Sequence, residues 1–301
     1  MKRSSFVFLA VALAVAASVP GASAQDGLKI YISADMEGVA GAVTGEQLGP
    51  SGFEYQRFRQ FMTDEVNAAI EAAFAAGATE ILVSDSHGNG QNLLIDQLPE
   101  NVRVIRSWPR PLGMMAGIDA SFDGVIYIGY HTSTTNTEGV RAHTMSSARL
   151  TAVKLNGVPV SEAAFNAAIA GHFGVPVIMV SGDDAIIEET RQIVGDVEGA
   201  IVKRALGFHS AETMTPVAAN HVIRDGVTAA VRRIDDFRPY QLKGPVELEV
   251  SMKNYRPVEL LGYLPNVDRV DSHTIRFVAK DMTEASGFMT FILSYNADLA
   301  P

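Results

Sequence analysis

Four short apolar runs and one long amphipathic stretch alternate along the first half of the chain, and this alternation limits the fold more than any other property of the sequence. The runs are typical of buried strands and comprise residues 28–34, 79–84, 102–105 and 124–129. Residues 53–76 repeat apolar side chains every three or four positions, which predicts a long helix that ends at Gly77. Strand, helix and strand joined by short segments favour right-handed crossovers and a mostly parallel sheet.

The second half continues this pattern and then changes. Two extended runs within residues 148–160 flank Asn156-Gly157, which predicts a hairpin or an edge strand. The elements expected next are a helix from Ser161 to about Phe173, a strand over 175–181, a helix capped by Asp183 or Asp184, and a helix over 216–234. The last quarter is expected to hold strands over 246–252 and 275–279 and a helix over 283–295. We therefore predict an α/β fold, a mostly parallel sheet flanked by helices, with a smaller C-terminal α+β portion.

Composition excludes several classes of protein. The chain has 301 residues, 47% of them hydrophobic, so a disordered or low-complexity chain is excluded. It has no Cys, which rules out disulfides, a thiolate nucleophile, zinc fingers and iron–sulfur clusters. Acidic residues outnumber basic ones by 34 to 24, which argues against binding nucleic acid or anionic lipid through bulk charge. Any metal must therefore be held by His and carboxylate side chains.

The N-terminus is typical of a secretory signal peptide. Lys2 and Arg3 precede an apolar run over residues 6–19, and the small residues Ala22-Ser23-Ala24 follow it. An uncleaved membrane anchor is the alternative, but a span needs about 18 or more apolar residues. No later segment is typical of a membrane span. We predict that residues 1–24 are removed, that 25–236 form the main α/β domain and 237–301 the smaller portion, and that the protein is periplasmic or secreted, with no membrane association after cleavage.

Polar side chains gather at the carboxyl ends of the predicted strands, where open α/β sheets bind ligands. Asp35 and Glu37 follow the first strand and, two residues apart in an extended segment, point the same way. The complete set of candidate residues at such positions, or following them along the chain, is Asp35, Glu37, His87, His131, His143 and Glu162. Carboxylates and His together form a ligand set suited to zinc or a similar divalent ion, and a third carboxylate would allow two metals with one carboxylate shared.

Each candidate also has a purely structural interpretation. Asp35 and Glu37 could form a solvated turn, His87 could be a loop residue, and Glu162 could match the dipole of its helix. His131 is harder to explain in this way, because burying an imidazole without a partner is costly. The joint placement of the set at separate strand and helix ends favours a metal site. The adjacent acids Asp183 and Asp184, by contrast, are expected to cap a helix.

Several short motifs resemble the D-aminopeptidase family, peptidase family M55. The motifs are SADMEG at 33–38, SDSH at 84–87, GYH at 129–131, HTM at 143–145 and the helix that opens with Glu162. The resemblance covers about residues 28–299 and includes VPVIMVSGDD at 175–184 and AKDMTEA at 279–285. The segment between His131 and His143 is longer than the family pattern.

The resemblance implies a catalytic domain with two zinc ions per chain. Asp35 would be shared by both metals, Glu37 and His131 would complete one site, and His87 and Glu162 the other. His143 matches the additional catalytic histidine. The implied reaction is removal of the N-terminal residue, a D-amino acid, from short peptides or amides by an activated water, with His143 moving the proton. Family members are also similar in forming a homodecamer that encloses the active sites.

Two alternatives of other classes stay open from the residues alone. A metal-dependent phosphoesterase would use the same ligand types, but it usually needs Arg or Lys to hold phosphate, and only Arg141 and Arg149 are near the candidates in sequence. A non-catalytic periplasmic binding protein would require a degenerate site. Metal analysis separates the binding protein from the enzymes, and peptide against phosphate substrates separates the two enzymes.

We expect the exported protein to begin near Gln25, because the signal peptide is predicted to be cleaved after Ala24. Intact-mass spectrometry of protein recovered from the periplasmic fraction or the medium measures this directly. A mass that retains Met1 to Ala24 would contradict the prediction.

Overall fold

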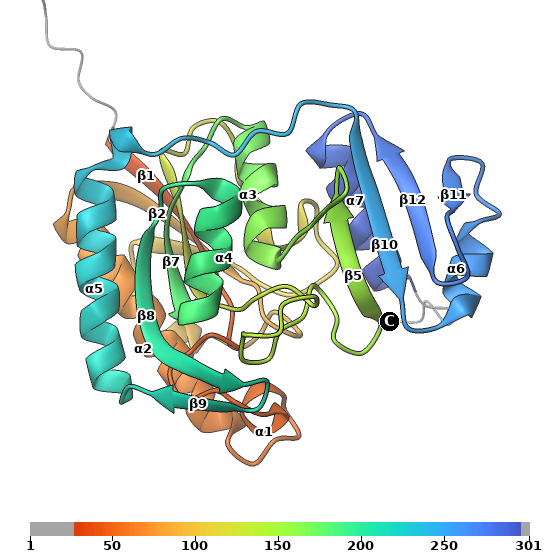
Figure 1. Ribbon diagram of the computed structural model, residues 1–301. Helices are drawn as coiled ribbons and strands as arrows, with labels where there is room; N and C mark the ends of the chain where they lie inside the picture. The colour runs from red at the N-terminus through yellow and green to blue at the C-terminus, as the bar shows by residue number, and fades with distance from the viewer. Residues whose placement is uncertain (1–26, 296–301) are drawn as a thin grey trace, which may run out of the picture.

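A seven-stranded sheet, here sheet A, forms the centre of the larger part of the molecule (Figure 1). The computed structural model describes residues 27–295, so the signal-peptide prediction lies outside the described residues. In sheet order, the strands are β3 (Val102–Ile105), β2 (Ala78–Asp85), β1 (Leu28–Ala34), β4 (Gly124–Tyr130), β7 (Val177–Asp183), β8 (Glu198–Gly207) and β9 (Ser210–Thr213). All neighbours are parallel except β8 and β9, so the predicted mostly parallel sheet is confirmed.

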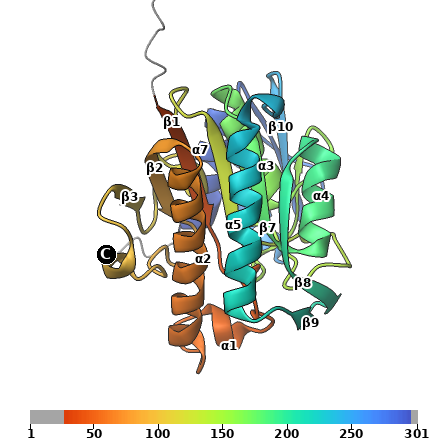
Figure 2. The same ribbon diagram turned by 90° about the vertical axis from the view of Figure 1, so that its left-hand side faces the viewer.

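Helices cover both faces of sheet A. On one face, α2 (Tyr55–Ala75) and α5 (Pro216–Arg232) lie side by side, as Figure 2 shows. On the other face lie α3 (Glu162–His172) and α4 (Asp184–Val194). Two predicted caps are confirmed, since the side chain of Ser161 accepts from the backbone N–H of Ala164 and that of Asp183 accepts from Ile186. The short helix α1 (Gly45–Leu48) was not predicted.

A second, antiparallel sheet, here sheet B, faces α3 from the side away from sheet A (Figure 1). Its strands in order are β11 (Val267–Arg269), β12 (Thr274–Ala279), β10 (Val246–Met252), β5 (Leu150–Leu155) and β6 (Val158–Pro159). The remaining elements are α6 (Tyr255–Leu261), α7 (Met282–Ser294) and the 3-10 turns η1 (Ile95–Gln97), η2 (Gly113–Met115) and η3 (Ile234–Asp236). The predicted hairpin is confirmed as β5–β6. Because β10 pairs with β5, sheet B joins residues from the middle of the chain to the C-terminal portion.

Helix α3 is the common wall of the two layers. Its sequence, EAAFNAAIAGH, is rich in small apolar residues, and every residue from Glu162 to Gly171 is buried. A helix that is apolar on all sides is stable only inside a protein. Its core cluster joins sheet B and α7 to one face of sheet A, whereas α2 and α5 form a separate cluster on the other face. The N-terminus of α3 is therefore fixed between the layers.

The chain order of sheet A reverses between β1 and β4, so the two strands lie at the kind of position where open α/β sheets bind ligands. Two glycines let the segments after these strands approach each other. Gly129 has φ +71°, and a Cβ there would overlap the carbonyl oxygen of Asp35. A Cβ on Gly38 would likewise overlap the carbonyl of Tyr130, and the Gly38 N–H donates to the Gly129 carbonyl at 2.7 Å.

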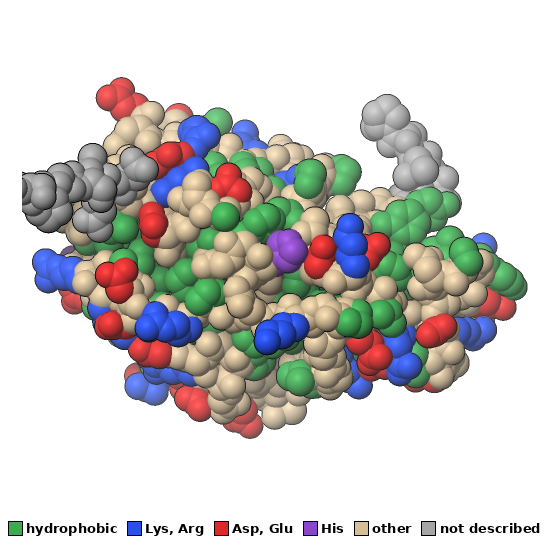
Figure 3. Space-filling model, turned by 90° about the horizontal axis from the view of Figure 1, so that it is seen from above, with side chains coloured by type: hydrophobic (Ala, Val, Ile, Leu, Met, Phe, Trp, Pro, Cys, Tyr) green, Lys and Arg blue, Asp and Glu red, His purple; other side chains and the backbone are tan. Residues whose placement is uncertain are grey.

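The surface mixes both signs of charge. On the face seen in Figure 3, Lys and Arg side chains alternate with Asp and Glu, and neither sign gathers into one large patch. Within residues 27–295, no helix has the length and apolar character needed to cross a membrane.

Candidate metal centre

The structure brings all six candidate residues to one edge of sheet A. Asp35 and Glu37 follow β1, and the Nδ1 atom of His87 lies 3.0 Å from Asp35 Oδ1 and 2.8 Å from Glu37 Oε2. The Nε2 atom of His131, directly after β4, lies 3.3 Å from Asp35 Oδ2 and 3.4 Å from Glu162 Oε1. Asp35 is thus the carboxylate that contacts both histidines.

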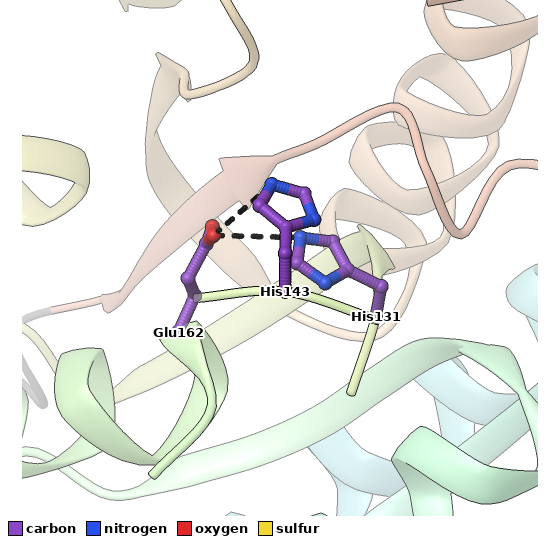
Figure 4. Close-up of side chains that lie close together, drawn as sticks. All are labelled: His131, His143 and Glu162. Atoms are coloured by element: carbon purple, nitrogen blue, oxygen red, sulfur yellow. Dashed lines mark ion pairs between the residues drawn. The ribbon is translucent and has the colours of Figure 1, made fainter. Parts of the chain in front are cut away.

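His143 lies at the edge of the same cluster (Figure 4). Its ring stacks on that of His131 with centroids 4.1 Å apart and planes within 7°, and its Nε2 is 3.7 Å from Glu162 Oε1. The longer segment between the two histidines therefore does not keep His143 from the site. Its side chain is 14% exposed, against 1% for His131, so His143 is the more accessible of the two rings.

Backbone carbonyls set the proton position on each ring. His87 Nε2 lies 2.6 Å from the Leu48 carbonyl oxygen, and His131 Nδ1 lies 3.0 Å from that of Thr132. A carbonyl can only accept, so the facing ring nitrogen carries the hydrogen. In a neutral imidazole the other nitrogen is then bare, and in both rings it is the one that faces carboxylates. Metal-binding histidines are commonly oriented in this way by a partner on the second nitrogen.

The cluster is buried and rich in negative charge. Burial raises the pKa of Asp35, and the charge of Glu37 raises it further. Burial also opposes ionisation of Glu37, but the charges of His87 and the other histidines hold its pKa well below the usual range. Burial alone would lower the pKa of His87 and His131, yet the facing carboxylates raise both pKa values well above normal. The three carboxylates therefore attract positive charge into the site.

Unpaired polar atoms at the centre fit a metal ion. Apart from the ion-pair contacts among themselves and with His87, Asp35 Oδ2, Glu37 Oε2 and His131 Nε2 are buried without a hydrogen-bond partner. In the part of the chain that the structure describes, Asp35, Glu37 and Glu162 form ion pairs only with histidines and none with Lys or Arg. Two groups of ligand atoms lie within 4.8 Å of one another: Asp35, Glu37 and His131, and His131, His143 and Glu162. Oxygen and imidazole nitrogen are the donors that zinc accepts in proteins, so the residues present fit this metal.

Two residues that sequence reasoning missed hold the loop after β1 in place. Lys203, buried within β8, donates from Nζ to the carbonyls of Glu37, Val39 and Ala42 at 2.5, 3.2 and 2.6 Å. Its burial lowers its pKa to about 8. From the other side, Glu65 of α2 accepts from the Ala40 N–H at 2.9 Å, and burial raises its pKa to about 7.

The loop that carries His87 is held by the residue that ends β2. Asp85 accepts from the backbone N–H groups of Asn92 and Leu93 at 2.6 and 2.8 Å. The Asn92 side chain then donates to the His87 carbonyl at 2.6 Å. Asp85 in the SDSH motif therefore orders the loop, whereas His87 supplies the group that faces the other carboxylates.

A pocket of about 510 Å³ opens beside the cluster. Five of the six candidates line it: Asp35, Glu37, His87, His143 and Glu162. Apolar side chains line it as well, including Trp108, Phe165 of α3, and Met289 and Leu293 of α7. An enclosed apolar pocket with a few convergent polar groups is the usual form of a small-molecule site. Taken together, an open α/β sheet, a His and carboxylate cluster at its reversal point and an adjoining pocket define a metal-dependent enzyme.

Comparison with known proteins identifies the family. A family model described as D-aminopeptidase, peptidase family M55, matches residues 28–291. The chain is 32% identical over 259 residues to the D-aminopeptidase of Bacillus subtilis (strain 168), which covers 86% of this chain and 94% of that relative. The chain therefore belongs to the D-aminopeptidase family, and the protein is a metallo-aminopeptidase, a hydrolase.

A solved structure supports the same assignment. The fold is similar, with a TM-score of 0.85 and 30% identity, to that of a protein described as the Zn-dependent D-aminopeptidase DppA from Bacillus subtilis, a self-compartmentalizing protease. The match covers 90% of this chain and 99% of that chain. The similarity to a zinc-dependent enzyme agrees with the donor set of the cluster. The family resemblance inferred from the motifs is confirmed, and membership favours the aminopeptidase over the phosphoesterase and the binding protein.

We expect Lys203→Met to destabilise the fold and to weaken metal binding. The change leaves three carbonyls without their donor, and each unsatisfied buried group costs about 1–3 kcal/mol. Urea unfolding measures the first effect and metal retention against a chelator the second. Lys243→Met, at an exposed position, is the matched control. Wild-type stability and metal retention in the Lys203 variant would show that the three carbonyls do not depend on this ammonium group.

Proposed function

We propose that the protein is a zinc-dependent aminopeptidase that removes the N-terminal residue, a D-amino acid, from short peptides or amides. The observation that carries this proposal is the buried cluster in which His87 Nδ1 and His131 Nε2 face three carboxylates, next to a pocket of about 510 Å³. The similarity to a D-aminopeptidase and to the structure of a Zn-dependent D-aminopeptidase, both from Bacillus subtilis, supports the metal and the substrate class.

We propose two zinc ions per chain, with Asp35 as the shared ligand. His87 lies beside Oδ1 of Asp35 and His131 beside Oδ2, so this carboxylate reaches both halves of the cluster. The resemblance assigns Glu37 and His131 to one zinc and His87 and Glu162 to the other. The ligand atoms of Asp35, Glu37 and His131 lie within 4.8 Å of one another, which fits the first of these two sites.

Zinc, when bound, would act as a Lewis acid that polarises a carbonyl and makes water nucleophilic near neutral pH. The chain's own residues complete the reaction. The free amino group of the substrate would bind at this cluster, to a zinc ion or to a carboxylate oxygen, which would explain cleavage at the amino end. His143 donates its Nδ1–H to the Arg141 carbonyl at 2.8 Å, so Nε2, beside Glu162, is the nitrogen that can take up a proton from the attacking water. From there it can be delivered to the leaving amine.

Export and assembly are part of the proposal. The signal-peptide pattern of residues 1–24 supports a periplasmic or secreted enzyme. The related DppA is described as self-compartmentalizing, which supports a homo-oligomer, and we propose the decamer that the family resemblance implies.

We expect the purified enzyme to contain about two zinc ions per chain and to hydrolyse D-alanyl amide faster than the L-form. Chelation should abolish activity, and zinc should restore it. Asp35→Ala should lose both metals, because a shared ligand serves two sites, whereas Asp236→Ala, exposed and distant from the cluster, should keep them. Metal analysis and a paired assay of both amides test this. A metal-free, fully active wild type would contradict the proposal.

We expect His143→Ala to keep its metals and its melting temperature but to lose activity by about 10²–10⁴, the usual effect of removing a general acid–base group. His221→Ala, on an exposed face of α5, is the control. Metal content, thermal unfolding and hydrolysis of a D-alanyl peptide are measured on one preparation. Loss of metal in parallel with activity would make His143 a ligand, and full activity would remove it from the mechanism.

A further inference from the structure

The charges that line the pocket are unequally divided. The three carboxylates of the cluster, Asp35, Glu37 and Glu162, lie at one part of its wall. Among the lining residues of the described chain, Arg149 is the only Lys or Arg. A peptide with free ends also carries one charge of each sign, with its amino group at the end that an aminopeptidase cleaves. In the proposed function the three carboxylates serve as metal ligands, so Arg149 is the charged group of the wall that remains for the carboxylate of such a substrate.

Arg149 lies on the same short segment of chain as His143. It is the last residue before β5, in a turn whose backbone bonds run from Arg149 and Leu150 to the Ser146 carbonyl at 3.3 and 3.0 Å. The same segment begins at His143, and the Met145 N–H donates to Glu162 Oε1 at 2.7 Å. One short stretch of chain thus connects the metal centre to the Arg149 side of the pocket.

The guanidinium of Arg149 is free to bind a ligand. Its side chain is exposed, and its one hydrogen bond in the structure runs from Nε to Ser146 Oγ at 3.5 Å. No Asp or Glu of residues 27–295 lies within ion-pair distance of it. The turn is also anchored from sheet B, since Lys253 Nζ donates to the Ser147 carbonyl at 2.6 Å. The guanidinium of Arg149 therefore lies at the pocket without a carboxylate partner.

Other cations near the site are already engaged. Lys203 binds three carbonyls, as described above. Arg110 donates to Ser84 Oγ and the Asp85 carbonyl, both at 2.9 Å, and covers the ring of Trp108. Arg141 stacks on Phe208. None of the three lines the pocket, so Arg149 is the cation that a bound substrate can reach.

We infer that Arg149 binds the free C-terminal carboxylate of the substrate, which makes the enzyme selective for unblocked di- and tripeptides. An extended dipeptide spans about 7 Å and a tripeptide about 10 Å, which suits a pocket of about 510 Å³. A guanidinium can hold a carboxylate through two parallel hydrogen bonds, which fixes the direction of the peptide. The inference rests on the proposed aminopeptidase function.

The test compares alanyl-alanine with its C-terminal amide, in the chirality that the wild type cleaves faster. We expect kcat/KM to favour the free acid by about 10-fold, mainly through KM, as for a charge-assisted hydrogen bond at a partly exposed site. Arg149→Gln should abolish this preference by lowering kcat/KM for the free acid to that for the amide, and Arg149→Lys should retain part of the preference. Arg106→Gln, at another exposed arginine outside the pocket, is the control.

The results of this test distinguish failure of the proposed function from failure of the inference about Arg149. If the zinc-loaded wild type cleaves neither compound, the proposed function fails. If it cleaves both and Arg149→Gln keeps the wild-type ratio, the function stands and the inference about Arg149 is overturned. An equal loss on acid and amide, at an unchanged melting temperature, would also overturn it, because the effect would then be independent of the carboxylate.

Discussion

The crowding of three carboxylates into one buried space is the constraint on which the rest of the structure depends. Asp35, Glu37 and Glu162 are each at most 6% exposed. Like charges at such separations repel strongly away from water, so they stay together only if positive charge lies between them. Within the described residues they form ion pairs only with histidines, and His87 and His131 each turn toward them the ring nitrogen that does not face a backbone carbonyl. A divalent metal meets this demand without requiring every ring to be protonated.

The backbone allows the three carboxylates to come this close together. Gly38 and Gly129 allow the ends of β1 and β4 to touch. Lys203 and Glu65 both hold the loop that follows β1. The third carboxylate comes from a different layer, because the buried α3 presents Glu162 at its N-terminus. Helix α7 then supplies another wall of the pocket. The smaller portion of the fold therefore contributes to where a substrate lies, while sheet A positions the reacting groups.

Most elements of the fold could be predicted from local patterns. The first strand, the long helix α2 and the caps of α3 and α4 follow from apolar periodicity and side-chain chemistry. Strands β8 and β9 could not, because Lys203 and Arg204 interrupt the apolar pattern of β8. Burial of Lys203 depends on carbonyls from the loop after β1, more than 160 residues earlier in the chain.

The sequence was sufficient to predict which residues form the candidate site, but not how these residues are arranged in space. Strand ends identified the residue types, and the resemblance assigned their roles. Which histidine lies against which carboxylate depends on strand register and on contacts such as the Leu48 carbonyl with His87, neither of which leaves a local signal. For the same reason the pocket wall supplied by α7 could not be foreseen from motifs at the other end of the chain.

Crystallography with anomalous scattering, recorded on both sides of the zinc absorption edge, tests the central claim most directly. We expect two zinc peaks per chain that share the carboxylate of Asp35, one beside Glu37 and His131 and the other beside His87 and Glu162. A single peak, or zinc held by residues other than these, would contradict the dinuclear centre.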